Sequence, residues 1–196
     1  MKQRTVAVSA IAVVLAIATL ALASAQTTSN LIVAGQSIGQ THLGKRGALY
    51  LAKLPTPDAN DSGMGRYRSV WLSKEQRRRT DTLYIYSVAN DPRNIKPRNG
   101  VIIWLIRVTS PWYRTSDSLS TGSTLPQILH SFPDVRTTDR SQTLYDDAKH
   151  GIAFEFAGRA IVGSACIAIM VHLPGNVNLA TAQDVNEILR ANRIQR

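Results

Sequence analysis

Apolar and polar residues alternate along several stretches of this chain in a way that predicts β-strands. In GIAFEF, for example, Ile152, Phe154 and Phe156 share one face, because successive side chains of a strand point to opposite sides. Short turn-like connectors such as NDPRN and DAKHG separate the stretches and favour antiparallel pairing. The predicted strands are Tyr67–Ser73, Thr82–Val88, Gly100–Ser110, Gln142–Asp147, Gly151–Gly158 and Ala165–Leu173.

A helical pattern precedes each group of three strands. The segments LGKRGALYLAKLP, at 43–55, and TGSTLPQILHSFP, at 121–133, each contain a Gly, an apolar stripe and a closing Pro. Thr124 or its neighbour Ser123 can cap the second helix, and Pro126 suits its first turn. The apolar positions of the second copy have helical spacing and are Leu125, Ile128, Leu129 and Phe132.

A third helix is predicted at Ala180–Arg193, near the end of the chain. Thr181 and Asp184 resemble a weakened capping box at its start. Val185, Ile188 and Leu189 lie on one side of it and are expected to dock on the rest of the protein.

These elements predict an α+β fold. It consists of two tandem units, each a helix plus a three-stranded antiparallel sheet, joined into one sheet with both helices on one face. The C-terminal helix follows as a separate element. The expected boundaries are 1–25 for a signal peptide, 26–110 for the first unit, 111–174 for the second and 175–196 for the helical tail.

The N-terminus has the features of a Sec-type signal peptide. Lys2 and Arg4 precede the apolar run Val6–Leu22, and Ala23-Ser24-Ala25 is a small-x-small cleavage site. We therefore expect a secreted or periplasmic protein that begins at Gln26 after cleavage. The alternative is an uncleaved membrane anchor, since the apolar run is nearly long enough to span a bilayer.

The charge and the single cysteine limit the function further. The formal net charge is +10, which favours polyanionic partners such as anionic envelope polymers. Cys166 cannot form an intramolecular disulfide and is expected to be an inert core thiol. The four histidines lack metal-ligand spacing, so no metal or cofactor is expected, and no nucleic-acid motif is present. The candidate polyanion-binding residues form one dense run and are Lys74, Arg77, Arg78 and Arg79.

Several segments between Ile38 and Leu173 resemble known families of bacterial secreted proteins. They are SIGQTHLG, LAKLPTPDANDSGMGRYRSVW, RVTSPWYRTSDSLSTGSTLPQILHSFPDV and YDDAKHGIAFEF. The pattern is similar to the tandem helix-plus-sheet modules of the β-lactamase inhibitor protein and to the outer-membrane assembly lipoproteins of the small-protein-A type. The resemblance implies binding to protein partners rather than catalysis. Because the chain lacks a lipidated cysteine and paired cysteines, no binding residue is transferred from either family.

A serine esterase is an alternative function. GQSIG, at 35–39, fits the Gly-x-Ser-x-Gly pattern, and small Gly-Asp-Ser-type esterases use an early Ser, a middle Asn and a late Asp-x-x-His. Such an enzyme would use Ser37 as nucleophile, His150 with Asp147 as base, and Asn90 at the oxyanion. That fold requires a parallel sheet with long helices, whereas short turns separate the strands predicted here.

Aromatic residues are concentrated on the predicted strands of the first unit. Tyr84 and Tyr86 share one side of their strand, and a sheet with helices on one face leaves its other face open. Tyr, Trp and Arg are common anchors of protein interfaces, although these aromatics could instead belong to the core. The predicted partner-binding residues are Tyr84, Tyr86, Trp104, Arg107, Trp112 and Tyr113.

The sequence therefore predicts a secreted or periplasmic, non-catalytic protein-binding module, either inhibitor-like or envelope-assembly-like. Its expected partner is another envelope or secreted protein. We expect no nucleic-acid partner, and no membrane span once the signal peptide is cleaved. The two alternatives are the serine esterase and an envelope polyanion-binding protein, for which binding would weaken steeply with salt.

Overall fold

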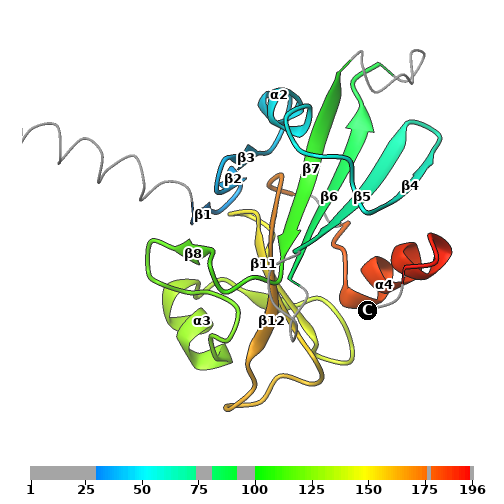
Figure 1. Ribbon diagram of the computed structural model, residues 1–196. Coiled ribbons are helices and arrows are strands. Elements are labelled where there is room, and N and C mark those ends of the chain that lie inside the picture. Colours follow the sequence, from blue (N-terminus) through cyan, green and yellow to red (C-terminus); the bar gives the residue numbers. More distant parts are fainter. Residues whose placement is uncertain (1–29, 74–80, 92–99, 176–177, 195–196) are drawn as a thin grey trace, which may run out of the picture.

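The computed structural model describes residues 30–73, 81–91, 100–175 and 178–194. Over these residues the chain is an α+β protein with an eight-stranded sheet, a four-stranded sheet and three α-helices (Figure 1). The predicted signal peptide at 1–25 and the basic run that contains Lys74, Arg77, Arg78 and Arg79 lie outside the described residues.

The eight-stranded sheet is antiparallel throughout, and its two halves mirror each other in strand order. The last strands of the halves pair at the centre, with Ile106 opposite Val171 and Val108 opposite Ile169. Across the sheet the strands are β4 (Ala59–Gly63), β5 (Arg66–Leu72), β6 (Thr82–Ala89), β7 (Val101–Val108), β12 (Cys166–His172), β11 (Ile152–Phe156), β10 (Leu144–Asp147) and β9 (Arg136–Thr137).

All six strands predicted from the alternating pattern are present, but the β-structure is more extensive than one sheet of two three-stranded units. β4 adds an outer strand to the first half and β9 adds one to the second. Neither has an apolar alternation: β4 reads ANDSG and only Ala59 in it is buried, while β9 has two exposed residues. Backbone pairing with a neighbouring strand forms these edges, so the side-chain pattern does not predict them.

The four-stranded sheet was not predicted either. Its strands are very short, and in spatial order they are β3 (Thr41–His42), β2 (Ser37–Ile38), β1 (Leu31–Val33) and β8 (Arg114–Thr115). The turn between β1 and β2 packs against the second half of the chain. The Gly35 N–H donates to the Gly151 carbonyl at 3.1 Å, and a Cβ on Gly35 would lie 2.7 Å from the His150 carbonyl oxygen. This close approach, with φ +65°, requires glycine.

The three helices lie on both faces of the large sheet (Figure 1). α2 (Arg46–Leu51) and α3 (Leu125–Ser131) flank the face that carries the main core, while α4 (Ala182–Ala191) packs on the opposite face. Thr124 is the N-cap of α3, as expected, and it forms a capping box with Gln127 that was not predicted. The capping box predicted for α4 forms between Thr181 and Asp184. α2 has no side-chain cap and is six residues long, which is about half of the segment 43–55 that carries the helical pattern.

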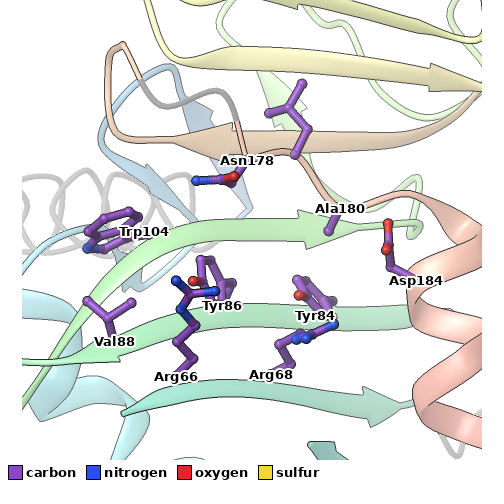
Figure 2. Close-up of a pocket in the computed structure, with 10 residues that line it drawn as sticks. Arg66, Arg68, Tyr84, Tyr86, Val88, Trp104, Asn178, Ala180 and Asp184 are labelled. Atoms are coloured by element: carbon purple, nitrogen blue, oxygen red, sulfur yellow. The ribbon is translucent and has the colours of Figure 1, made fainter. Parts of the chain in front are cut away.

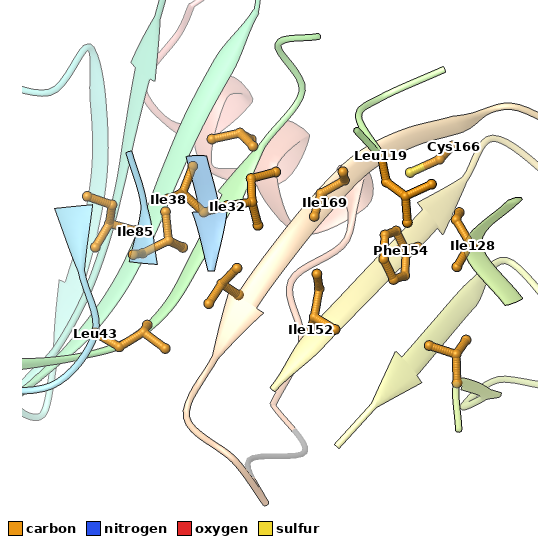
Figure 3. Packing of buried hydrophobic residues seen from close by; sticks show 14 of the residues in the cluster. Ile32, Ile38, Leu43, Ile85, Leu119, Ile128, Ile152, Phe154, Cys166 and Ile169 are labelled. Carbon is orange, nitrogen blue, oxygen red and sulfur yellow. The ribbon is translucent and has the colours of Figure 1, made fainter. Parts of the chain in front are cut away.

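Two hydrophobic clusters hold the layers together. The larger cluster joins the small sheet, α3 and one face of the large sheet, and it buries Ile128, Phe154 and Cys166 (Figure 3). The smaller cluster joins Val185, Ile188 and Leu189 of α4 to the other face. Part of the face that we expected to be open is therefore covered by α4. Among the described residues, no helix is long and apolar enough to cross a membrane.

Candidate functional site

An arginine- and aromatic-lined pocket lies on the α4 side of β5, β6 and β7. The strand register places Arg68 opposite Tyr86, and a register shift after Tyr86 leaves Trp104 without a partner residue on β6. Trp104 packs edge-to-face on Tyr86, with ring centroids 6.2 Å apart and planes at 80°. This contact forms an aromatic wall on the sheet.

We call this cavity the sheet-face pocket, and its volume is about 290 Å³ (Figure 2). Strands β5, β6 and β7 form its floor, while the segment that leads from β12 into α4 borders it through Asn178, Leu179 and Ala180. The polar and aromatic side chains that line it are Arg66, Arg68, Tyr84, Tyr86, Trp104 and Asp184. The fold thus brings together three of the predicted binding residues, namely Tyr84, Tyr86 and Trp104.

Tyr84 lies at the buried end of the pocket and is 2% exposed. Burial raises the pKa of its hydroxyl; the nearby Arg68 opposes that rise and the nearby Asp184 adds to it. No residue of the described segments makes a hydrogen bond with this hydroxyl. A buried donor therefore lines the pocket without a hydrogen-bond partner among the described residues.

The charged residues that line the pocket differ in whether they have a partner within the protein. Arg68 Nε lies 3.3 Å from Asp61 Oδ2, in an ion pair that is about half exposed. Asp184 Oδ2 accepts hydrogen bonds from the Thr181 N–H at 2.7 Å and from the Thr181 hydroxyl at 2.8 Å, so it serves the α4 cap. Within the described segments Arg66 has no ion-pair partner.

Arg107 was predicted to contact a partner, but the structure places it in a buried ion pair. Its side chain is 2% exposed, and its Nε and Nη2 donate to Glu155 Oε2 at 3.1 and 2.6 Å. The other Glu155 oxygen accepts from the Ala182 N–H at 2.6 Å, at the start of α4. Arg107 therefore holds Glu155, which bonds to the start of α4, and its buried side chain is not available to a partner, which corrects the prediction from sequence.

Trp112 and Tyr113 lie away from the sheet-face pocket. Trp112 is 64% exposed, and Tyr113 is half-buried against the main core, where burial, with a contribution from Tyr50, raises its pKa. Both border a separate cleft of about 860 Å³ beside Trp71. The six predicted binding residues consequently occupy three different environments.

The esterase residues are only partly assembled. His150 Nδ1 lies 2.7 Å from Asp147 Oδ2, and the His150 side chain is half exposed. Ser37 is 5% exposed in the small sheet, and Asn90 follows β6, from which three strands separate β10 with its Asp147. The large sheet is antiparallel, whereas this class of esterase requires a parallel sheet. In the part of the chain that the structure describes, no cluster of three or more potential metal ligands occurs.

Sequence reasoning missed Arg66, Arg68 and Asp184 as pocket residues. The first two alternate in RYRSVW, which places both on the face of β5 that carries Val70, and Val70 belongs to the α4-side cluster. That alternation could have identified them. Two arginines on the same face of a strand as a buried valine indicate that this face is covered near the valine and exposed near the arginines. Nothing in the sequence indicates that Asp184 reaches this strand.

Comparison with protein families, with curated proteins and with solved structures gives no match to this chain. The geometry of the site is therefore the basis for the function proposed for this protein.

Proposed function

We propose that this protein is a secreted or periplasmic, non-catalytic protein-binding module that recognises its partner through the sheet-face pocket. The observation that carries the proposal is the Tyr86–Trp104 edge-to-face pair, which lines a pocket beside Arg66 and Arg68 on a sheet face that α4 covers only in part. Aromatic residues and arginine dominate the binding energy of many protein interfaces.

The proposed architecture is a tandem repeat of related helix-plus-sheet units, similar to the β-lactamase inhibitor protein and the small-protein-A lipoproteins. The order of elements supports it, because α2 precedes β4 to β7 and α3 precedes β9 to β12. In such a protein the broad antiparallel sheet presents a binding face, and the positive net charge accelerates encounter with an acidic partner. The proposed localisation rests on the signal-peptide pattern at 1–25.

A pull-down from cell-envelope extract tests the proposal. The bait is residues 26–196, washed at about 0.15 M and about 1 M salt, where the Debye length is about 8 and 3 Å. A specific, partly apolar interface retains one protein partner at high salt. The Tyr86→Ala/Trp104→Ala double variant is expected to lose that partner.

Trp112→Ala is the matched control, since it removes an exposed aromatic side chain that lies outside the sheet-face pocket. Retention of the partner by the double variant, or its loss only in Trp112→Ala, would contradict the proposed site. Recovery of salt-labile polyanions alone would favour the polyanion-binding function over a dedicated protein partner.

A further inference from the structure

The Tyr84 hydroxyl is a buried polar group that lines the sheet-face pocket. No described residue bonds to it. Most buried polar groups in proteins are hydrogen-bonded, and a buried donor without a partner is destabilising. A donor of this kind in the floor of a pocket indicates an acceptor group supplied by a ligand.

The charged residues that line the pocket specify the ligand group further. Arg66 has no carboxylate partner in the described segments, and Arg68 forms an ion pair with Asp61. The Asp184 carboxylate accepts hydrogen bonds from Thr181 in the N-terminal cap of α4. Among the residues that the structure describes, the positive charge of Arg66 is therefore without an ion-pair partner. A singly charged carboxylate matches it, whereas a doubly charged phosphate would be repelled more strongly by Asp184, which lines the same pocket.

The aromatic wall specifies what lies next to that carboxylate. Tyr86 and Trp104 line the same cavity as Arg66, and their rings pack edge-to-face on each other (Figure 2). An apolar or aromatic side chain of a ligand gains free energy when it packs on such rings. The occupant that fits both features is an acidic residue adjacent to an apolar one in a peptide.

We infer that the sheet-face pocket binds a carboxylate from an acidic segment of the protein partner, with Arg66 providing the opposite charge and the Tyr84 hydroxyl donating a hydrogen bond. This inference rests on the proposed function, because it names the chemical group by which the partner is recognised.

Two short peptides, which differ only in a side-chain carboxylate or carboxamide, test the inference. The probes are acetyl-Ala-Phe-Glu-Ala-amide and its glutamine counterpart, each titrated at millimolar concentration into the ¹⁵N-labelled mature protein. The chain has three tryptophans, so the indole N–H signals of Trp71 and Trp112 serve as internal references for that of Trp104. Trp104→Phe assigns the signal. We expect the glutamate peptide to shift the Trp104 signal and to bind about tenfold tighter than the glutamine peptide, which corresponds to about 1.4 kcal/mol.

Three variants then assign the donors. Tyr84→Phe and Arg66→Gln are each expected to weaken binding of the glutamate peptide by about tenfold, while Arg46→Gln, which removes an exposed charge on α2, leaves it unchanged. Tyr84→Phe is also expected to keep or raise the melting temperature, because it removes an unpartnered buried hydroxyl. A merely structural tyrosine would instead lose stability on this change.

Equal affinity for the two peptides would overturn the inference, and so would the lack of any Trp104 shift with either peptide. Tighter binding of phenyl phosphate than of the glutamate peptide would also overturn it, in favour of a phosphate site. None of these results depends on the pull-down with the Tyr86→Ala/Trp104→Ala variant. The proposed function can therefore fail or hold separately from the carboxylate site.

Discussion

The buried contact between Arg107, Glu155 and the start of α4 gives the sharpest test of the fold around the pocket. We consider Glu155→Gln, which keeps the shape of the side chain but removes its charge and one acceptor oxygen. In the native protein the two Glu155 oxygens accept from Arg107 Nε, Arg107 Nη2 and the Ala182 N–H, at 3.1, 2.6 and 2.6 Å. The substitution leaves the Arg107 charge buried without a counter-ion.

The size of the effect follows from that burial. Removal of one partner of a buried ion pair destabilises a protein by about 3–5 kcal/mol. For a domain of this size each kcal/mol shifts the melting temperature by about 2–4 °C, so the expected decrease is about 6–20 °C. Glu187→Gln, on the exposed side of α4, is the matched control and is expected to change the free energy of unfolding by less than about 0.5 kcal/mol.

Chemical and thermal unfolding followed by circular dichroism measures both variants. A double variant, Arg107→Met with Glu155→Leu, shows whether the loss comes from an unpaired buried charge. Replacing both partners by apolar groups leaves no buried charge and is expected to restore most of the stability. A residual loss of about 1 kcal/mol is expected from the unpartnered Ala182 N–H. The reasoning is refuted if Glu155→Gln unfolds within about 1 kcal/mol of the wild type, or if the double variant is as unstable as the single one.

Three further predictions concern the core, the cysteine and the esterase alternative. Ile128→Ala should destabilise the protein by about 2–5 kcal/mol, because Ile128 is fully buried. Leu129→Ala, on the exposed side of the same helix, should cost far less. Equal losses of stability in urea unfolding would contradict this packing. Cys166 should resist a thiol reagent at pH 8 until the protein unfolds, since burial raises its pKa to about 12 and keeps it protonated; rapid labelling of the native protein would count against its burial. A fluorophosphonate probe should leave Ser37 unlabelled, because Ser37 is buried and the sheet is antiparallel; labelling lost in Ser37→Ala would restore the esterase.

The strands and helix caps of this chain could be predicted because their signals are local. Alternation between apolar and polar residues identified β11, and the pairing of Thr181 with Asp184 marked the start of α4. The polar strand β4 has no such signal. It forms because its backbone pairs with β5, which places Asp61 opposite Arg68.

The site was less predictable because long-range packing decides which side chains are exposed. Arg107 was expected on the surface, yet Glu155, 48 residues later in the chain, meets it under α4. Tyr84 was expected on an open face, and α4 together with the segment before it covers that residue. Neither outcome can be inferred from spacing along the chain, since both depend on the face to which α4 docks.

Site-specific photo-crosslinking in the living cell tests whether the sheet-face pocket contacts a protein partner. Benzoylphenylalanine replaces Tyr86 in one strain and Leu49, which is 77% exposed on α2, in another. A partner bound at the sheet-face pocket gives one discrete crosslinked protein from position 86 and none from position 49. No crosslink from position 86, or the same products from both positions, would contradict it.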